Sequence, residues 1–349
     1  MVYSTQKARL NEHKDVLITL WGKNFHGLNA GRFSWIYKNN INGTPVVFLL
    51  KHEESQTFVG TLTLFQRIFC YKGQRVKAYI CGDMAVNSQH RSLGPAVSLF
   101  KAAVKQCNGD SPCILLSFPN EKSEPVALRT GFKVLGEYSE LVKVIRTRKY
   151  LQQHLKVRFL NNVVALLLEV LLRLRFDTFF FGNLGHYSFE VLPCFDQRFD
   201  EFWETIKCSY DFLGERDCNY LSWRVGGSPY SENRIFTLFS LKDKKIKGYI
   251  AFHLDEGRVI VDDIFCCLDR KIFQVLIFLF SRNQRMNGAD SISISFAGNH
   301  TMLSGFKNRG FYFRGVISKV VAYASFGGDN FIKNINGGEW YMTSADNDI

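Results

Sequence analysis

The stretch "GDMAVNSQHRSLGPAVSLFKAAV" runs from Gly82 to Val104. An apolar run ends at Val86, a polar loop follows, and an amphipathic run begins around Pro95, which predicts a strand, a loop and a helix. The first N–H groups of a helix have no internal partner, and the helix dipole adds partial positive charge there, so this junction attracts anions. Gly94 leaves the backbone open to a close approach, and Arg91 can bind phosphate through two donors. The stretch therefore predicts a phosphate-binding turn.

The loop also has a recognisable spacing. The pattern V-x-x-x-x-R-x-x-G-x-A resembles the pyrophosphate loop of the GNAT superfamily of acyl-CoA N-acyltransferases. Downstream, "SFPNEKSEPVALRTGFKVLG" (117–136) resembles the Asn…Gly-Phe segment of that family. The resemblance covers about Val46 to Gly136. It implies a mixed α/β domain that uses acetyl-CoA or another acyl-CoA as cosubstrate and needs no metal.

The resemblance also assigns roles to single positions. The strand before the loop would pair its backbone with the pantetheine arm, the loop would hold the pyrophosphate, and an Asn downstream would contact the arm. Gly131 and Phe132 would close the fold. The implied cofactor-binding residues are Met84, Ala85, Val86, Arg91, Ser92, Leu93, Gly94, Pro95, Ala96 and Asn120.

One position departs from the family pattern. Seven residues after Asn120, many members carry a Tyr that protonates the departing thiolate, and this chain has Ala127 there. The thiolate then leaves unassisted, or another group such as Tyr138 serves in its place.

Direct transfer to an amine also calls for a base, because a protonated amine has no lone pair. Asp83, just before the presumed thioester site, is the predicted catalytic base. Glu121 and Glu124 are the alternatives on the loop after Asn120, and Glu121 is also a candidate acceptor-binding residue. Any of the three could instead be a solvated or helix-capping carboxylate.

The two halves of the chain repeat the same sequence features in the same order. "FSWIY" (33–37), "AYICGDMAV" (78–86) and "LRTGFKVLG" (128–136) correspond to "LSWRV" (221–225), "VIVDDIFCC" (259–267) and "FKNRGFYFRG" (306–315). This order predicts an internal duplication. We therefore expect two tandem GNAT-like mixed α/β domains, residues 1–145 and 186–349, joined by a helical linker over 146–185.

The second copy lacks the loop. After "VIVDDIFCC" comes "LDRKIFQVLIFLF", which has no glycine and no R-x-x-G-x-A, so we expect no acyl-CoA site there. Asp262 and Asp263 lie on the strand that matches the one carrying Asp83. We predict that they line an acceptor cleft; the alternative is a purely structural half.

The linker contains an amphipathic segment, residues 146–176, with seven Lys or Arg and one Glu. A helical wheel puts Arg158, Asn162, Glu169 and Arg173 on one face. The other face carries Leu160, Val163, Val164, Leu167, Val170, Leu171 and Leu174. We expect a connector packed on both domains; the alternative is a helix lying on an anionic membrane surface.

The totals limit the remaining possibilities. The 349 residues are 46% hydrophobic and 22% charged, which is typical of a globular protein. The net charge of +12 favours anionic or phosphorylated partners. Nine cysteines without a regular framework favour reduced thiols, and we expect no signal peptide or spanning helix. We therefore expect a cytoplasmic protein, with a possible peripheral contact at the inner face of the membrane.

The repeat as a whole looks like the tandem acyltransferases found among bacterial envelope and polysaccharide functions. The predicted acceptor is a small-molecule or lipid-linked amine, such as an amino sugar; O-acylation stays open. Two other functions are considered. A Fem-type transferase would use aminoacyl-tRNA, but this chain has the CoA loop and lacks a coiled-coil arm, which makes a nucleic-acid partner improbable. A CoA-binding scaffold would explain Ala127 and the altered second copy.

Overall fold

The computed structural model describes residues 2–24, 30–109, 112–148, 151, 158–177 and 181–347. The side chains of Arg158, Leu160 and Asn162, which the helical wheel used, lie outside this description. The strands are β1 (Tyr3–Lys7), β2 (Val46–His52), β3 (Thr57–Tyr71), β4 (Gln74–Val86), β5 (Cys113–Ser117), β6 (Lys133–Val144), β7 (Tyr187–Leu192), β8 (Phe212–Gly214), β9 (Arg234–Ser240), β10 (Ile246–Asp255), β11 (Arg258–Cys266), β12 (Ser291–Gly298), β13 (Tyr312–Ala324) and β14 (Tyr341–Met342). The helices are α1 (Leu10–Gly22), α2 (Ala30–Arg32), α3 (Leu93–Gly109), α4 (Glu124–Arg129), α6 (Arg158–Phe176), α7 (Gln197–Ile206), α8 (Cys218–Leu221), α9 (Arg270–Met286), α10 (His300–Asn308) and α11 (Gly328–Asn336).

The predicted mixed α/β class is confirmed, and both halves follow one plan. The order β1-α1-β2-β3-β4-α3-β5-α4-β6 in the first half recurs as β7-α7-β9-β10-β11-α9-β12-α10-β13 in the second. In both halves the strand before the long helix is antiparallel to its predecessor and parallel to its successor. In the first half this parallel successor is β5, whose sequence "CILLS" is nearly all apolar and is buried throughout, as expected for a central strand.

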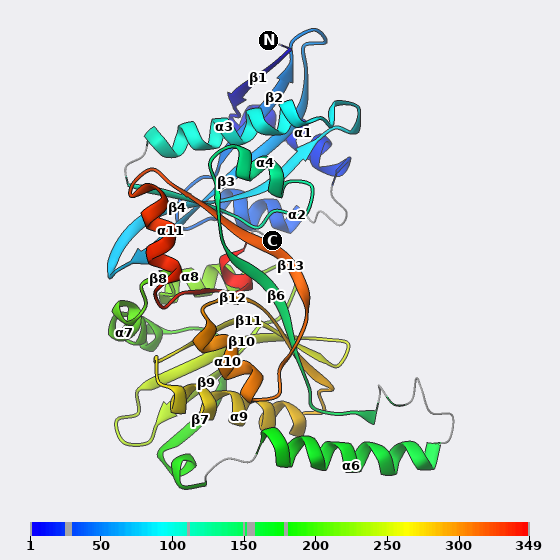
Figure 1. The fold of residues 1–349 in the computed structure, drawn as a ribbon, viewed down its shortest axis with the longest axis vertical. Coiled ribbons are helices and arrows are strands. Elements are labelled where there is room, and N and C mark those ends of the chain that lie inside the picture. Colours follow the sequence, from blue (N-terminus) through cyan, green and yellow to red (C-terminus); the bar gives the residue numbers. More distant parts are fainter. Residues whose placement is uncertain are drawn as a thin grey trace.

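The two halves exchange their last strands. Within the described residues one 14-stranded sheet runs through the molecule. Twelve of its strands follow the order β1-β2-β3-β4-β5-β13-β6-β12-β11-β10-β9-β7, and off this path β8 pairs with β3 and β14 with β12. The family resemblance implies that the strand after Gly131 and Phe132 closes the first half. Instead β6 pairs with β12 of the second half, and β13 pairs with β5 of the first. Figure 1 shows β6 and β13 side by side where the two halves meet.

Two equivalent tryptophans, one from each half, meet at this junction. The indole N–H of Trp35 donates to the carbonyl of Trp223 at 2.7 Å, and the indole N–H of Trp223 donates to the carbonyl of Trp35 at 3.0 Å. Each lies in a π-helical turn, Phe33–Lys38 or Ser222–Gly226. The reciprocal bonds relate the halves as a near-twofold pair.

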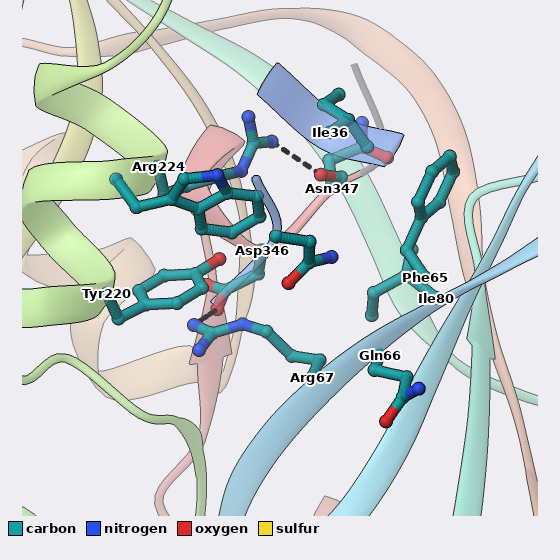
Figure 2. A pocket seen from close by; sticks show the side chains of 11 residues that line it. Ile36, Phe65, Gln66, Arg67, Ile80, Tyr220, Arg224, Asp346 and Asn347 are labelled. Carbon is teal, nitrogen blue, oxygen red and sulfur yellow. Dashed lines mark hydrogen bonds and ion pairs between the residues drawn. The ribbon is translucent and has the colours of Figure 1, made fainter. Parts of the chain in front are cut away.

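The C-terminal segment is buried between the halves. Asp346 forms ion pairs with Arg67 of β3 at 3.1 Å and with Arg216 of the second half at 2.5 Å. Burial disfavours the charged carboxylate, but Arg216 and Arg67 prevail and lower the pKa of Asp346. Figure 2 shows the guanidinium of Arg67 against the ring of Tyr220, 3.3 Å from its centroid. The cavity beside them is about 30 Å³, which is too small for a substrate.

Helix α6 packs on the protein through a face other than its apolar one. Ala165 is buried and Glu169 accepts a hydrogen bond from the backbone N–H of Thr147 at 3.0 Å, so this face of the helix lies against the protein. The apolar face predicted to pack, with Leu167 and Leu171, is turned outward. Hydrogen bonds to Thr147 therefore determine which face of α6 contacts the protein, and the apolar face of the helix is directed away from the protein.

Among the described residues no helix combines the length and the apolar character that crossing a bilayer requires.

The exchanged strands should make the two halves unfold together. Replacing Phe296, a fully buried side chain of β12, by Ala should cost about 3–5 kcal/mol. We expect native-state hydrogen exchange to show the same loss of protection in β5 as in β12, because β13 and β6 tie both strands into one cooperative unit. Loss of protection confined to the second half would contradict this expectation.

Candidate functional site

The candidate site is a groove that opens where β4 and β5 separate. The two strands pair in parallel from Lys77 and Cys113 as far as Cys81 and Ser117. Beyond this point β4 continues to Val86 with β3 as its only ladder partner, while β5 ends. The resulting groove has a volume of about 1070 Å³. Its lining includes the predicted residues Asp83, Met84, Ala85, Val86, Arg91, Ser92, Leu93, Ala96 and Asn120.

The predicted phosphate loop forms the mouth of this groove. Arg91, Ser92, Leu93 and Gly94 are exposed, and α3 begins at Leu93. The guanidinium of Arg91 lies over the end of β4, donating to the carbonyl of Val86 at 3.0 Å and to Asn24 Oδ1 at 2.8 Å. A Cβ added at Gly94 would meet no atom within 4 Å, so the space beside its backbone is open. Pro95 and Ala96 are buried in the first turn.

A β-bulge lies in the middle of the groove. Thr63 pairs with Gly82 and Thr61 pairs with Ala85, so Asp83 and Met84 together face a single residue of β3. Asp83 has φ 46°, in the left-handed region that non-glycine residues rarely adopt. A bulge leaves backbone polar groups outside the ladder and re-aims the strand. The groove therefore has backbone hydrogen-bonding groups at its centre.

The carboxylate of Asp83 is held by two side chains. Arg32 donates two hydrogen bonds to it, at 2.7 and 2.8 Å, and the hydroxyl of Tyr37 donates a third. The side chains of Arg32 and Asp83 are only 5% and 9% exposed. Burial, and then the charge of Asp83, raise the pKa of Tyr37 well above its usual value. A substrate amine would have to displace one of these donors before Asp83 could accept its proton.

The other predicted first-half residues differ in their relation to the groove. Asn120 lines it, and its side-chain oxygen accepts from the backbone N–H groups of Lys122 and Ser123 at 3.1 and 3.0 Å. Glu121 is exposed and is not part of the lining. Glu124 forms an ion pair with Lys319 of β13, at 2.6 Å. Of the two alternative bases, neither therefore faces the groove as a free carboxylate.

The position of Ala127 explains why no Tyr occupies it. Ala127 is fully buried in the core beneath α3, whereas its neighbour Val126 lines the groove. A ring at position 127 would enter the core and could not reach the groove without repacking. Tyr138 lies against the groove residue Phe118, but burial raises the pKa of its phenol to about 12, so it is a weak proton donor.

Comparison with known proteins addresses the fold. No family model and no curated protein matches the sequence. Solved structures match nearly the whole chain. A conserved Enterococcus faecalis protein described as a probable N-acyltransferase gives a TM-score of 0.62 at 11% identity, covering 95% of this chain and 74% of that one. A GCN5-related N-acetyltransferase from Anabaena variabilis gives 0.60 at 13% identity, covering 98% and 85%.

Saccharomyces cerevisiae N-myristoyltransferase with bound myristoyl-CoA gives a TM-score of 0.51 at 9% identity, covering 93% of this chain and 82% of that one. The chain has the GNAT fold. Within this fold, the first half carries the groove between β4 and β5, with the bulge at Asp83 in its middle.

In the second half the corresponding gap of the GNAT fold is filled. Beyond the β11–β12 pairing, β12 pairs with β14 of the C-terminal segment. The hydroxyl of Tyr341 donates to the carbonyl of Ile264 on β11 at 2.7 Å, which bridges the space between the two strands. The helix after this gap is also capped internally, since Asp269 accepts from the backbone N–H of Lys271 at 2.7 Å. An anion site needs this helix end free, and the described residues of the second half leave no equivalent groove between β11 and β12.

This filled gap corrects the expectation for Asp263. Its side chain is fully buried and accepts hydrogen bonds from Arg216, Tyr249 and Thr343. It holds the C-terminal segment and is not open to an acceptor. In the β10–β11 bulge Asp263 keeps its ladder partner, Ala251, and Asp262 is the unpaired residue, whereas Asp83 is itself unpaired in the first half.

Asp262 is instead half-exposed and pairs with His253 Nδ1 at 2.7 Å. Neither residue lines the groove between β4 and β5. The hydrogen bond that His253 donates to Asp262 raises the pKa of His253 above its usual value, and burial opposes the rise only in part.

Several groove residues had no signal in the sequence. Arg32 comes from a segment before β2 that carries no motif, and Tyr230 comes from a loop of the second half. Tyr37 lies in the repeated stretch FSWIY, and nothing in that stretch indicates that its hydroxyl holds Asp83. Lys122 and Phe118 lie beside the predicted Asn120 but belong to no charge or spacing pattern.

The Arg32–Asp83 pair should be a large contributor to stability. Arg32→Met leaves a buried carboxylate uncompensated and should cost about 3–5 kcal/mol, whereas the double variant Arg32→Met/Asp83→Leu should lose much less than the sum of the single changes. Urea unfolding measures the coupling. Arg129→Met, at an exposed position of α4, is the control and should change stability by no more than about 0.5 kcal/mol. Additive single effects would show that the pair is not coupled.

The Asp262–His253 pair should make stability depend on pH. The pKa of His253 is higher folded than unfolded, so its stabilisation is fully present below an unfolded pKa of about 6.5 and is lost as pH rises through the folded pKa. We expect His253→Gln to destabilise the protein more at about pH 5.5 than at about pH 8.5. Chemical denaturation at the two pH values measures this. An equal cost at both would contradict the assignment.

Proposed function

We propose that the chain is an acyl-CoA-dependent N-acyltransferase whose first half binds the acyl-CoA in the groove between β4 and β5. The observation that carries the proposal is the coincidence of three features in one groove: a divergent pair of parallel strands, a bulge with Asp83, and the open N-terminus of α3 beside Gly94. The solved structures that share the fold, described as N-acyltransferases and as an N-myristoyltransferase with bound myristoyl-CoA, support the same reaction class.

The residues of the groove fit the parts of such a cosubstrate. The pyrophosphate would lie at the start of α3, where helix N–H groups and Arg91 offer positive charge and Gly94 leaves space. The pantetheine arm would run along the free edge of β4 over Met84, Ala85 and Val86. Asn120 can donate from its side-chain amide, because its oxygen is already used by the turn that it starts.

The chemistry that the cosubstrate supplies is an activated acyl thioester. The chain's part is to position it and to polarise its carbonyl, and the backbone N–H groups at the Asp83–Met84 bulge are suitable donors because the ladder leaves them out. Arg32 and Tyr37 hold the bulge in place through the carboxylate of Asp83. Unassisted departure of the thiolate is feasible, since a thiol pKa of about 8.5 makes it a fair leaving group.

For the acceptor we propose the amine of an amino sugar or another anionic envelope precursor, as in the tandem acyltransferases that the repeat resembles. The net charge of +12 supports an anionic acceptor. The second half contributes Tyr230 to this groove, an exposed side chain that an acceptor could contact.

A second candidate is a CoA-binding scaffold without catalysis. The occupied carboxylate of Asp83 and the burial of Ala127 favour it, because the groove then has no free general base or acid among these positions. The enzyme releases free CoA thiol from acetyl-CoA when an amine acceptor is present, and the scaffold binds acetyl-CoA without release. A thiol-release assay across a panel of amino sugars and polyamines separates the two.

The binding mode is tested by Gly94→Glu. The added carboxylate would repel the pyrophosphate at the start of α3, so CoA affinity in calorimetry should fall more than tenfold. The free protein should keep its fold, because nothing lies within 4 Å of the new Cβ. Gly109→Glu is the matched control: it lies at the other end of the same helix, is equally open, and should leave affinity unchanged. Unaltered CoA binding by Gly94→Glu would contradict the assignment.

A further inference from the structure

Helix α6 presents an uncovered apolar stripe to solvent. Leu166, Leu167, Leu171 and Leu174 are between 58% and 61% exposed. Val163 and Val170, on the same stripe, are each 41% exposed. At 1.5 Å per residue the 19-residue helix is about 28 Å long, so the stripe is far larger than the single exposed leucines that globular surfaces tolerate. Figure 1 shows α6 at the end of the second half, away from the first.

Polar bonds fix the direction in which the stripe points. The hydroxyl of Thr147 donates to the backbone carbonyl of Ala165 at 3.1 Å, and the backbone N–H of Thr147 donates to the carboxylate of Glu169. The side chain of Arg309 donates to the backbone carbonyl of Phe176 at 3.3 Å. These groups lie on the face opposite the leucines, because 100° separates successive residues. The helix is therefore anchored with its apolar side outward.

Positive charge borders the stripe. Arg173 and Arg175 lie on its two edges. Beside Arg173, between α6 and α9, a groove of about 860 Å³ is lined by arginines. They are Arg146, Arg148, Arg173, Arg282 and Arg285.

The acids in this groove are mostly neutralised. Asp177 accepts from Lys143 and Arg285, both at 2.6 Å, and these cations outweigh burial and lower the pKa of its carboxyl. Glu169 lies 3.8 Å from Arg173. Asp290 is the third acid of the lining. The rim of the apolar stripe is thus net cationic.

We propose that α6 binds the surface of an anionic lipid bilayer, lying in the plane of the membrane with its leucines in the acyl boundary and the arginine groove on lipid phosphates. An apolar face bordered by cations is the chemistry of interfacial helices. Protein interfaces instead favour aromatic residues and paired hydrogen bonds, and the described side chains of this stripe, from Val163 to Leu174, are aliphatic. The proposal does not depend on the proposed enzymatic function.

The test uses the full chain and vesicles of phosphatidylcholine, alone or mixed equally with phosphatidylglycerol. We expect co-sedimentation with the anionic vesicles, weakening as salt rises, and little with phosphatidylcholine alone. Leu167→Gln/Leu171→Gln removes apolar contact without changing charge and should lower the binding constant at least tenfold. Arg173→Gln/Arg282→Gln should weaken binding and flatten its salt dependence.

The matched control is Ile18→Gln/Ile41→Gln. These side chains, 46% and 48% exposed, lie in the first half, and the double change should leave vesicle binding unaltered. All variants change exposed positions, so circular dichroism and the urea midpoint should stay close to those of the parent chain. No binding to anionic vesicles at low salt would overturn the proposal. So would a dimer, measured by sedimentation velocity, that Leu167→Gln/Leu171→Gln dissolves, since the stripe would then be covered by a second copy.

Discussion

The pairing of β6 with β13 is the interaction on which the rest of the structure depends. Each strand belongs by sequence to one half and by hydrogen bonding to the other. The pairing brings Trp35 against Trp223 and lets Asp346 bridge Arg67 and Arg216. The same junction brings the second half close enough for Tyr230 to reach the groove of the first.

Two copies of one plan have come to differ at one place. Both carry a carboxylate on a bulged strand, held by a guanidinium and a phenol: Asp83 by Arg32 and Tyr37, Asp263 by Arg216 and Tyr249. The second copy has this arrangement although Tyr341 fills the gap between its strands β11 and β12, so what the two copies share is a carboxylate held beside a bulge. What sets the first copy apart is open space: a glycine at the start of its helix where the second has a capping aspartate, and an empty gap where the second has Tyr341.

The sequence predicts what is local and leaves out what is distant. The loop from Arg91 to Ala96 could be placed because strand end, glycine and helix start are neighbours in the chain. The duplication could be read because its order is preserved. The exchange of β6 and β13 could not be predicted, because the same residues form strands whether each strand pairs within its own half or with the other half. The burial of Asp263 depends on a segment some 80 residues away, and that of Ala127 on a one-residue difference in helical phase. The helical wheel identified the apolar face of α6 correctly, but it could not show that the rest of the protein lies on the opposite face of the helix.

The exchange also has a consequence for the order of events during synthesis. β5 acquires its second neighbour only when Val321 to Ala324 arrive, roughly 200 residues later. At typical elongation rates that interval is on the order of 10–40 s, long compared with the folding of a small domain. Throughout it, a strand of almost purely apolar residues keeps one unsatisfied edge. The sheet of the first half therefore stays incomplete during synthesis, and β5 cannot be paired on both edges until the ribosome has added the residues of β13.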